Sequence, residues 1–562
     1  MHSHKILKLA RPHLSLQNSF SRELGISKIL AQVLINRGIN TLTLAQSFLK
    51  PDISGMLDPN SFLQMSKAVG LVKKARQNND RVLVFGDYDV DGITSTVLAK
   101  SVLVKMGLDV LHYLPHRVKE GYGLNSGAVN FAKENKVKLV ITADCGTSNH
   151  EEVQALRQAN IDVVVTDHHE PQNLNLPAAS SIINPKLKHS GYAYRDLAGV
   201  GVVYKLAQAL TGSLLIDELD LVTLGTVADS VPLTGENRII VKEGIGKFSG
   251  TQRPGLRAIM ENAGIADKKF NSTYISFIIA PRLNASGRMS DAETSLKLLM
   301  SSTRGEADIL AAELEVFNRQ RQKTESNILK EAEALINAEI NFKEHKVIVI
   351  AKEGWHHGVL GIVASKLADR FYRPAIVISL SEDICKGSGR SIKNFHLFEA
   401  LEDCKESLQS FGGHAHAVGL LICKDNIEDF KKSINKLAHE RLSLEDLLPG
   451  IDVDMELRLS DLNEDLAKEC ELLEPFGMAN PEPLFYSRAL KLKGQVQSLG
   501  RETLKFWVTD GLTTIQAIGF GMSSLRQTLL EAQSIELVYT LRMDYWQGAS
   551  SLILEAKEIF FK

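Results

Sequence analysis

One stretch of the chain, residues 81–185, alternates short apolar runs with segments of helical spacing. Strands separated by helical segments of about 10–20 residues form βαβ units, so this stretch predicts an α/β domain with a parallel sheet buried on both faces. No other feature of the sequence constrains the fold as strongly. The five predicted strands are RVLVFG (81–86), VLHYLP (110–115), VKLVITAD (137–144), IDVVVTD (161–167) and SIINP (181–185).

Acidic and imidazole side chains follow three of these strands. In an open parallel sheet the ligand crevice lies outside the carboxyl ends of the strands, so these side chains are expected at one edge. Any one segment alone could be a surface turn or a pair of core histidines, but three in succession favour a site. The segments are Asp87-Tyr88-Asp89-Val90-Asp91-Gly92, Asp144-Cys145-Gly146 and Asp167-His168-His169.

Clustered carboxylates repel one another unless a cation is present, so this edge predicts a metal centre. Many carboxylates with one or two histidines suit Mn²⁺ or Mg²⁺ better than a tetrahedral zinc site. The potential ligands are more than one such ion needs. Two divalent ions about 3.5–4 Å apart are therefore expected, an arrangement that serves phosphate-ester hydrolysis.

The rest of the chain divides into four further segments. Residues 306–343 contain no Gly or Pro, which predicts one long helix between two lobes. A second α/β unit follows, and the last part has short β-like runs with polar turns, typical of a small barrel. We expect an N-terminal helical segment (1–75), the first α/β domain (76–305), the connecting helix (306–343), the second α/β domain (344–445) and a barrel (450–562).

The N-terminal helices are best interpreted as a cap on the first α/β domain, with a helix-turn-helix use as the alternative. Residues 1–50 carry seven Lys/Arg and one acid, a local charge of +6, whereas the whole chain has a net charge of −2. That region could meet a polyanion.

The composition predicts the cellular compartment of the protein. Five widely spaced cysteines favour reduced thiols, and we expect a cytoplasmic protein without a secretory signal. No apolar run approaches the roughly 18 residues of a membrane span, so no membrane association is expected.

The motifs GDYDVDG, ADCG and TDHH together resemble those of the DHH phosphoesterase family. The longer context resembles one bacterial branch of that family, the single-strand-specific exonucleases. The supporting stretches are LPHRVKEGYGLN (114–125), LAGVGVVYK (197–205), LVTLGTVADSVPLTGENR (221–238), PRLNASGRM (281–289), GWHHGVLGIVASKL (354–367), KGSGRS (386–391), FGGHAHAVGL (411–420) and LEPFGMANPEP (473–483).

The resemblance implies a set of metal ligands and a residue that meets the scissile phosphate. His169 would take that second role, acting with Asp144 and His168 in catalysis. Spacing alone does not single out Asp229, which enters only through the resemblance. The implied metal ligands are Asp89, Asp91, Asp144, His168 and Asp229, with Asp87 as a ligand or a close partner of one.

The second α/β domain resembles the DHH-associated domain. Its Gly-rich turns offer hydroxyls, cations and free main chain, which makes them plausible phosphate cradles, although such turns are often only turns. The resemblance implies a pocket for a terminal 5′ phosphate contacted by Ser388 and Arg390. His414 is a further candidate, and Arg282 and Arg288 are expected to face the same cleft.

The barrel resembles an OB fold, a common binder of single strands. Phe506, Trp507, Tyr545 and Trp546 are candidate stacking platforms, although such aromatics are more often core.

Together these resemblances imply a 5′→3′ exonuclease of DNA repair and recombination that acts on single-stranded DNA and releases mononucleotides. They also suggest a single-strand-binding protein and a helicase as partners. Two alternatives stay open: a phosphoesterase of small nucleotides, and a scaffold without catalysis.

Overall fold

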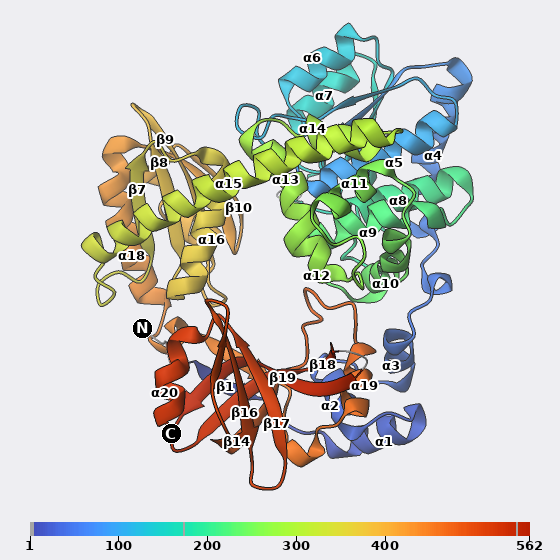
Figure 1. The fold of residues 1–562 in the computed structure, drawn as a ribbon. Helices are drawn as coiled ribbons and strands as arrows, with labels where there is room; N and C mark the ends of the chain where they lie inside the picture. The colour runs from blue at the N-terminus through green and yellow to red at the C-terminus, as the bar shows by residue number, and fades with distance from the viewer. Residues whose placement is uncertain (1–4, 172–174, 547–548) are drawn as a thin grey trace.

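The computed structural model describes residues 5–171, 175–546 and 549–562. It contains two α/β lobes joined by a long helix, and a barrel that lies beneath both lobes in the view of Figure 1. Both ends of the described chain lie at the barrel. Among the described residues, every helix is too short or too polar to span a bilayer.

The first lobe contains the predicted parallel sheet, in the order β3-β2-β4-β5-β6. Apolar residues from both faces of its central strands are buried, which explains the continuous apolar runs in the sequence. The prediction of an α/β fold with a parallel sheet is confirmed. The strands are β2 (Val82–Gly86), β3 (Val110–Tyr113), β4 (Leu139–Ala143), β5 (Asp162–Thr166) and β6 (Ser181–Ile183).

Helices cover both faces of this sheet. One face packs against α4 (Met65–Asn78), α5 (Val90–Lys105) and α8 (Gly199–Thr211), and the other against α6 (Ser126–Glu134) and α7 (His150–Gln158). The helices that complete the lobe are α9 (Leu219–Ala228), α10 (Gly235–Ser249), α11 (Pro254–Asn262), α12 (Ser272–Tyr274), α13 (Ala280–Met289) and α14 (Glu293–Met300).

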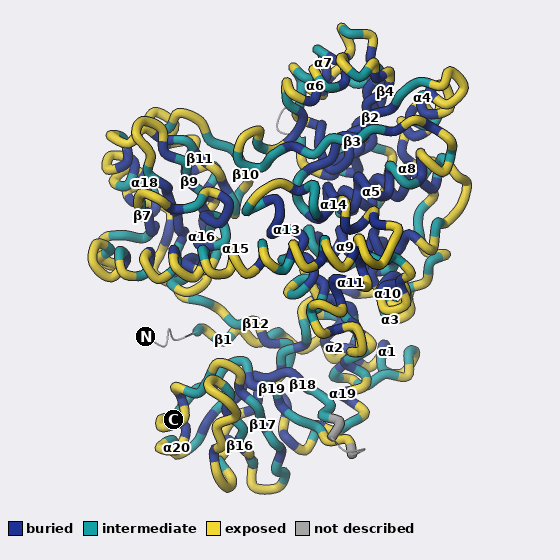
Figure 2. Tube along the Cα trace, turned by 45° about the horizontal axis from the view of Figure 1, so that its top comes forward, coloured by how far each residue is buried: buried dark blue, intermediate teal, exposed yellow. Residues whose placement is uncertain are grey.

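The predicted connecting helix is α15 (Arg304–Glu339), which has 36 residues and a length of roughly 54 Å at 1.5 Å per residue. Thr303 caps its start by accepting a hydrogen bond from the backbone of Glu306. Its first half buries Leu314 in the first lobe, and its second half buries Ile336 in the second lobe. One side of α15 stays exposed along the helix (Figure 2), so it joins the two cores as a brace.

The second lobe has a mixed sheet in the order β10-β11-β9-β8-β7. Its strands are β7 (Ile348–Glu353), β8 (Ala375–Leu380), β9 (Ile384–Arg390), β10 (Ser410–His414) and β11 (Ala417–Cys423). Its helices are α16 (Leu360–Phe371), α17 (Leu397–Asp403) and α18 (Ile427–Arg441).

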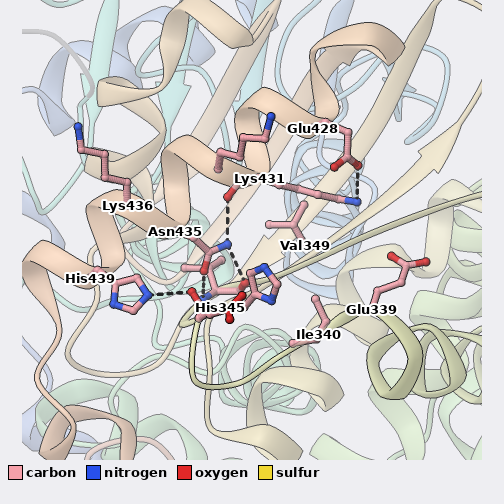
Figure 3. Close-up of a pocket in the computed structure, with 12 residues that line it drawn as sticks. Glu339, Ile340, His345, Val349, Glu428, Lys431, Asn435, Lys436 and His439 are labelled. Carbon is pink, nitrogen blue, oxygen red and sulfur yellow. Dashed lines mark hydrogen bonds and ion pairs between the residues drawn. The ribbon is translucent and has the colours of Figure 1, made fainter.

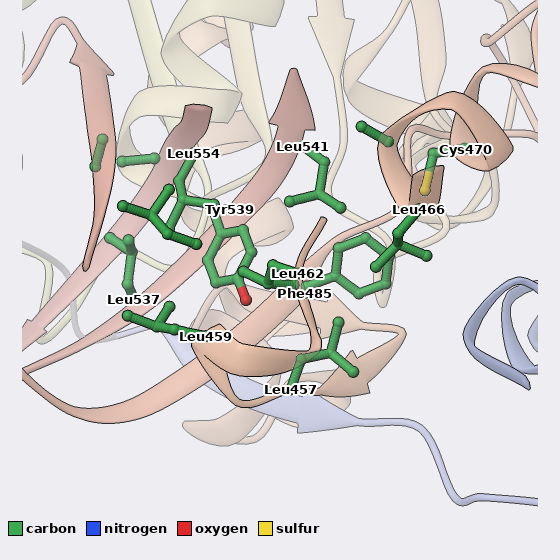
Figure 4. Close-up of a cluster of buried hydrophobic side chains, with 14 of the residues drawn as sticks. Leu457, Leu459, Leu462, Leu466, Cys470, Phe485, Leu537, Tyr539, Leu541 and Leu554 are labelled. Atoms are coloured by element: carbon green, nitrogen blue, oxygen red, sulfur yellow. The ribbon is translucent and has the colours of Figure 1, made fainter. Parts of the chain in front are cut away.

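The C-terminal domain is a barrel, as predicted. Its sheet has the order β13-β14-β18-β19-β17-β16-β15, and an additional β14–β16 pairing closes it. Phe485, Tyr539 and Leu554 lie in its core (Figure 4). The strands are β13 (Met455–Glu456), β14 (Phe485–Leu492), β15 (Gln497–Leu499), β16 (Thr503–Thr509), β17 (Thr514–Phe520), β18 (Ile535–Trp546) and β19 (Ala549–Phe561), and α19 (Glu464–Glu471) and α20 (Arg526–Glu531) flank them.

The candidate stacking residues of the barrel separate into two kinds. Phe506 is fully buried and belongs to the core, whereas Trp507 is 42% exposed on the outer face. The side chains of Tyr545 and Trp546 lie outside the described residues.

The N-terminal helices differ from the prediction. Helices α1 (Leu14–Leu24), α2 (Lys28–Asn36) and α3 (Leu42–Leu49) share one hydrophobic core with the barrel at the other end of the chain (Figure 1). Strand β1 (Ile6–Leu9) pairs with β12 (Gly450–Val453). The predicted cap on the first α/β domain was therefore wrong for these three helices, and of the described helices within residues 1–78 only α4 packs on the parallel sheet. Periodicity reveals an apolar face but not the partner that buries it.

Candidate active site

The carboxyl ends of three neighbouring strands bring the predicted site residues together. Asp87, Asp144 and Asp167 directly follow β2, β4 and β5, which lie side by side in the sheet. His168 Nε2 lies 3.2 Å from Asp144 Oδ1. It also lies 3.8 Å from Asp91 Oδ2 and 3.6 Å from Asp229 Oδ2. One imidazole therefore meets acids from three separate segments of the chain.

These side chains form adjoining groups with metal-binding geometry. In each group the candidate ligand atoms all lie within 4.8 Å of one another. Two groups share His168 and two share Asp144, which is the arrangement expected where two ions share ligands. The groups are Asp91–His168–Asp229, Asp144–His168–His169 and Asp87–Asp89–Asp144.

The electrostatics of the cluster favour a cation. Burial, followed by the charges of neighbouring acids, raises the pKa of Asp87, Asp144 and Asp229 well above the ordinary value. The same causes raise the pKa of Asp91 to about 7. Asp87 Oδ1, Asp144 Oδ1 and His168 Nε2 are buried and have no hydrogen-bond partner among the described residues. Oxygen and imidazole atoms so placed fit Mn²⁺ or Mg²⁺.

Two close contacts at the start of α8 hold Asp91 and Asp144 in place. The backbone amides of Gly199 and Val200, at the start of α8, donate to Asp91 Oδ2 (2.7 Å) and Oδ1 (2.8 Å). A Cβ at Gly199 would lie 2.3 Å from Asp144 Oδ1, so only glycine fits there. Asp89 caps α5 by accepting a hydrogen bond from Gly92. The LAGVG segment is therefore a support for two predicted ligands.

Asp167 supports the site rather than joining the metal-binding groups. Its carboxylate accepts hydrogen bonds from the backbone amides of Thr147 and His168, and its Oδ1 lies 2.8 Å from His169 Nδ1. Burial raises the pKa of Asp167, but its bonds with His169 outweigh burial and hold the pKa below its ordinary value. Burial lowers the pKa of His169, yet Asp167 and nearby acids raise it to about 9. In the metal-free protein, His169 is therefore a cation at neutral pH.

Tyr122 is a site residue that the sequence analysis did not single out. Its hydroxyl lies 2.9 Å from His169 Nδ1 and donates to the carbonyl of Asp144 at 3.2 Å. Tyr122 lies in the GYG part of LPHRVKEGYGLN, and that placement between two glycines was the available signal. Asp229 follows α9 and no strand, which is why spacing did not reveal it.

A second feature is a cleft of about 550 Å³ between the two lobes. The first lobe contributes Tyr88, Arg117 and Arg288, and the second contributes Lys386, Ser388 and Arg390, among others. Burial, then the charge of Arg117, lowers the pKa of Arg288 to about 9 and also lowers the pKa of Lys386 and Arg390. No carboxylate is among the described residues that line it, so the cleft suits an anion.

Three of the five predicted phosphate-binding residues line this cleft: Arg288, Ser388 and Arg390. Arg282 instead pairs with Glu315 of α15 at 2.8 Å and is not among the lining residues. His414 lies exposed at the tip of β10. Partial burial, then the charges of Arg390, His416 and His169, lowers the pKa of His414. Arg117, within LPHRVKEGYGLN, also lines the cleft, although the sequence did not single it out.

Another cavity, of about 700 Å³, lies between α18 and the end of α15 (Figure 3). Its polar side chains pair with nearby groups: Asn435 with the backbone of Val347, and His439 with the carbonyl of Glu344. None of the predicted site residues lines it.

The parallel sheet carries this cluster at its strand ends, and the second lobe contributes to an anion cleft. This combination is typical of the DHH class of phosphoesterases. The model of the DHH family N-terminal domain matches residues 81–226, that of the DHHA1 domain residues 344–440, and that of the RecJ OB domain residues 453–558. All three assignments agree with the architecture described above.

Relatives of known identity extend this agreement over nearly the whole chain. The single-stranded-DNA-specific exonuclease RecJ of Bacillus subtilis is 36% identical over 555 residues, covering 98% of this chain and 70% of the relative. The Escherichia coli protein of the same name is 34% identical, covering 93% of this chain and 94% of the relative. The chain belongs to the RecJ family.

Solved structures agree with this assignment. RecJ from Thermus thermophilus in complex with Mn²⁺ has a TM-score of 0.86 and 27% identity, covering 100% of this chain and 80% of that chain. The same protein in complex with Mg²⁺ has a TM-score of 0.78 and 26% identity, covering 99% of this chain and 78% of that chain.

Proposed function

We propose that this protein is a metal-dependent exonuclease that hydrolyses single-stranded DNA from the 5′ end and releases 5′-mononucleotides. The observation that carries the proposal is the set of three adjoining metal-binding groups, two of which share Asp144 and two of which share His168. Such an arrangement serves phosphodiester hydrolysis. The relatives named as single-stranded-DNA-specific exonucleases support the choice of substrate.

The residues of the site have two roles, which are binding the metal ions and offsetting charge on the phosphate. Asp87, Asp89, Asp91, Asp144, His168 and Asp229 would hold two divalent ions, Mn²⁺ or Mg²⁺. When bound, these ions supply phosphate charge neutralisation and activation of the attacking water. His169, protonated and oriented by Asp167 and Tyr122, offsets the negative charge that develops on the scissile phosphate.

The position of the cationic cleft supports the 5′-end preference and the size of the product. Tyr88 lines the cleft, and its neighbours Asp87 and Asp89 belong to a metal-binding group. A terminal phosphate bound by Arg117, Ser388 and Arg390 would therefore lie close to the ions. We propose that this spacing places the first internucleotide linkage at the metal centre and that the cleft between the lobes excludes duplex.

The wider role is a proposal that follows from the family. We place the protein in DNA repair and recombination in the cytoplasm, with a single-strand-binding protein and a helicase as partners. The alternative of a phosphoesterase for small nucleotides lacks a use for the barrel and the long helix.

Digestion of strands labelled at either the 5′ or the 3′ end tests the proposal. With Mn²⁺, a single strand should release mononucleotides from its 5′ end, while duplex of the same sequence and a dinucleotide are poor substrates. Asp144→Ala should abolish release. Equal turnover of the dinucleotide and the long strand would favour the small-nucleotide alternative.

A further inference from the structure

The first turn of α10 connects parts of the chain that lie far apart in sequence. Its residues Glu236, Asn237 and Arg238 are all buried, although all three are polar. Each binds a different segment. Glu236 accepts a hydrogen bond from the backbone of Leu57 at 2.9 Å, and Asn237 donates to the carbonyl of Pro232 at 3.1 Å.

Arg238 makes the longest-range contacts of the three. Its guanidinium donates to the carbonyls of Leu473 (2.9 Å), Glu474 (3.0 Å) and Leu472 (3.2 Å), which precede the barrel strands. It also donates to the carbonyl of Phe48 in α3 at 2.8 Å and lies over the Phe48 ring at 3.8 Å. No carboxylate is among the hydrogen-bond partners of Arg238 in the described part of the chain.

The loop that Arg238 binds, residues 472–481, is held from several sides. Ser272 donates to the carbonyl of Phe476 at 2.7 Å, and the amide of Leu233 donates to the carbonyl of Met478 at 2.8 Å. Arg37, which follows α2, donates to the carbonyl of Pro481. Asn480 is fully buried and fixes the loop internally by donating to the carbonyls of Leu473 and Pro475.

The contacts between the first lobe and residues 472–481 lie close in sequence to the metal centre. Leu233, which binds the loop, comes four residues after the candidate ligand Asp229. The loop is continuous with β14 of the barrel, and α2 and α3 share the core of the barrel. Arg238 therefore ties the barrel and its N-terminal helices to the lobe that carries the catalytic residues.

We propose that Arg238 is a positioning residue that fixes the orientation of the barrel relative to the metal centre, so that a long strand bound by the barrel is directed into the site. This rests on the proposed function. A guanidinium that binds four carbonyls in a fixed planar geometry restrains the angle between the segments that it joins. An ammonium group, with a single charged nitrogen, cannot do so.

Arg238→Lys tests this with two independent readouts. The first is the distance distribution between spin labels at Leu512→Cys in the barrel and Glu134→Cys in the first lobe, with the exposed Cys423 replaced by Ser. The second is kcat/KM for a 30-nucleotide strand compared with a trinucleotide. Lys242→Met is the matched control, because Lys242 is a second cation of α10 and donates to the carbonyl of Glu474 at 3.3 Å.

We expect Arg238→Lys to broaden the distances, and to lower kcat/KM about tenfold for the long strand and less than about twofold for the trinucleotide. Mn²⁺ affinity should be retained, which shows that the site is folded, and Lys242→Met should resemble the wild type. Unchanged distances, or equal losses on both substrates, would overturn the proposal. If the wild type degraded no DNA, the proposed function would fail, and the spin-label distances alone would decide whether Arg238 sets the orientation.

Discussion

His168 is surrounded by acids and yet remains uncharged. Burial, followed by the positive charge of His169, lowers its pKa to about 3, so at neutral pH it offers lone pairs rather than protons. A neutral imidazole among carboxylates is the state that a metal ion requires of its ligand. The two adjacent histidines thus differ in charge because the ring of His169 lies 2.8 Å from the Asp167 carboxylate, whereas Asp167 meets His168 through its backbone amide.

Removing the shared carboxylate should disable the site. Asp144→Asn keeps the size of the side chain but removes its charge, and both groups that contain Asp144 lose an anionic ligand. We expect kcat to fall by roughly 1,000-fold, with weaker Mn²⁺ binding by calorimetry. Asp109→Asn, which changes an exposed acid of the same lobe paired with Arg81, is the control and should have no effect. Turnover of Asp144→Asn within tenfold of the wild type would contradict this role.

Metal binding should stabilise the protein more at high pH than at low pH. The pKa of Asp91 is about 7 in the folded, metal-free protein, compared with about 3.9 when unfolded. The folded state therefore binds more protons, and the stability contributed by this group is lost as the pH rises from about 4 through 7. A cation replaces those protons. We expect Mn²⁺ to raise Tm more at pH 8 than at pH 5.5. A larger rise in Tm at pH 5.5 would show that these acids do not bind the ion together.

The site residues that sequence alone could predict are those that lie within one or two residues after the end of a strand. Asp87, Asp144 and His168 belong to this kind, because the βαβ pattern fixes where strand ends lie. Asp229 and Arg117 do not, since the first follows a helix and the second lies in an irregular segment. Their placement depends on tertiary packing.

At the scale of elements, the start of α8 is the critical support. Gly199→Ala would force a methyl group against Asp144 Oδ1, where a Cβ has only 2.3 Å. We expect turnover to fall roughly 100-fold, because displaced ligands no longer meet the same ion. Gly201→Ala is the matched control in the same helix, since its Cβ meets only the Leu197 side chain at 3.2 Å. Equal effects of the two variants would show that the damage is to α8 as a whole.

The long helix should matter for the cleft rather than for metal binding. Lys323 is exposed in the middle of α15, between the segments that pack on the two lobes. Lys323→Pro would kink the helix at a cost of about 3 kcal/mol and displace the second lobe. Mn²⁺ affinity should survive while DNA hydrolysis is lost, and Lys323→Ala should retain both. DNA hydrolysis at the wild-type rate in Lys323→Pro would rule out the brace.

The helices and strands that the sequence predicted correctly are those whose hydrophobic pattern lies within one segment of the chain. The parallel sheet and the long helix both follow from periodicity within one segment. The N-terminal helices were assigned to the wrong partner because their contacts span the chain, as when the amide of Ser27 donates to Glu469. Such pairings have no local signature.

At the scale of the whole molecule, the two lobes share one anion cleft. Arg390→Met should abolish the preference for a 5′-phosphorylated strand over a 5′-hydroxyl strand, because a charge-assisted contact is lost. We expect a loss of about tenfold for the phosphorylated strand only. Arg282→Met is the control, since Arg282 pairs with Glu315 and does not line the cleft. A loss of preference in Arg282→Met but not in Arg390→Met would place the phosphate elsewhere.

The most direct test of the whole account is anomalous scattering from Mn²⁺ in crystals soaked with a short 5′-phosphorylated strand. We expect two Mn²⁺ peaks flanking one linkage, with Asp144 bound to both ions, His168 to at least one, and the terminal phosphate beside Arg390. A single ion away from Asp144, or a strand bound with its 3′ end in the cleft, would contradict it.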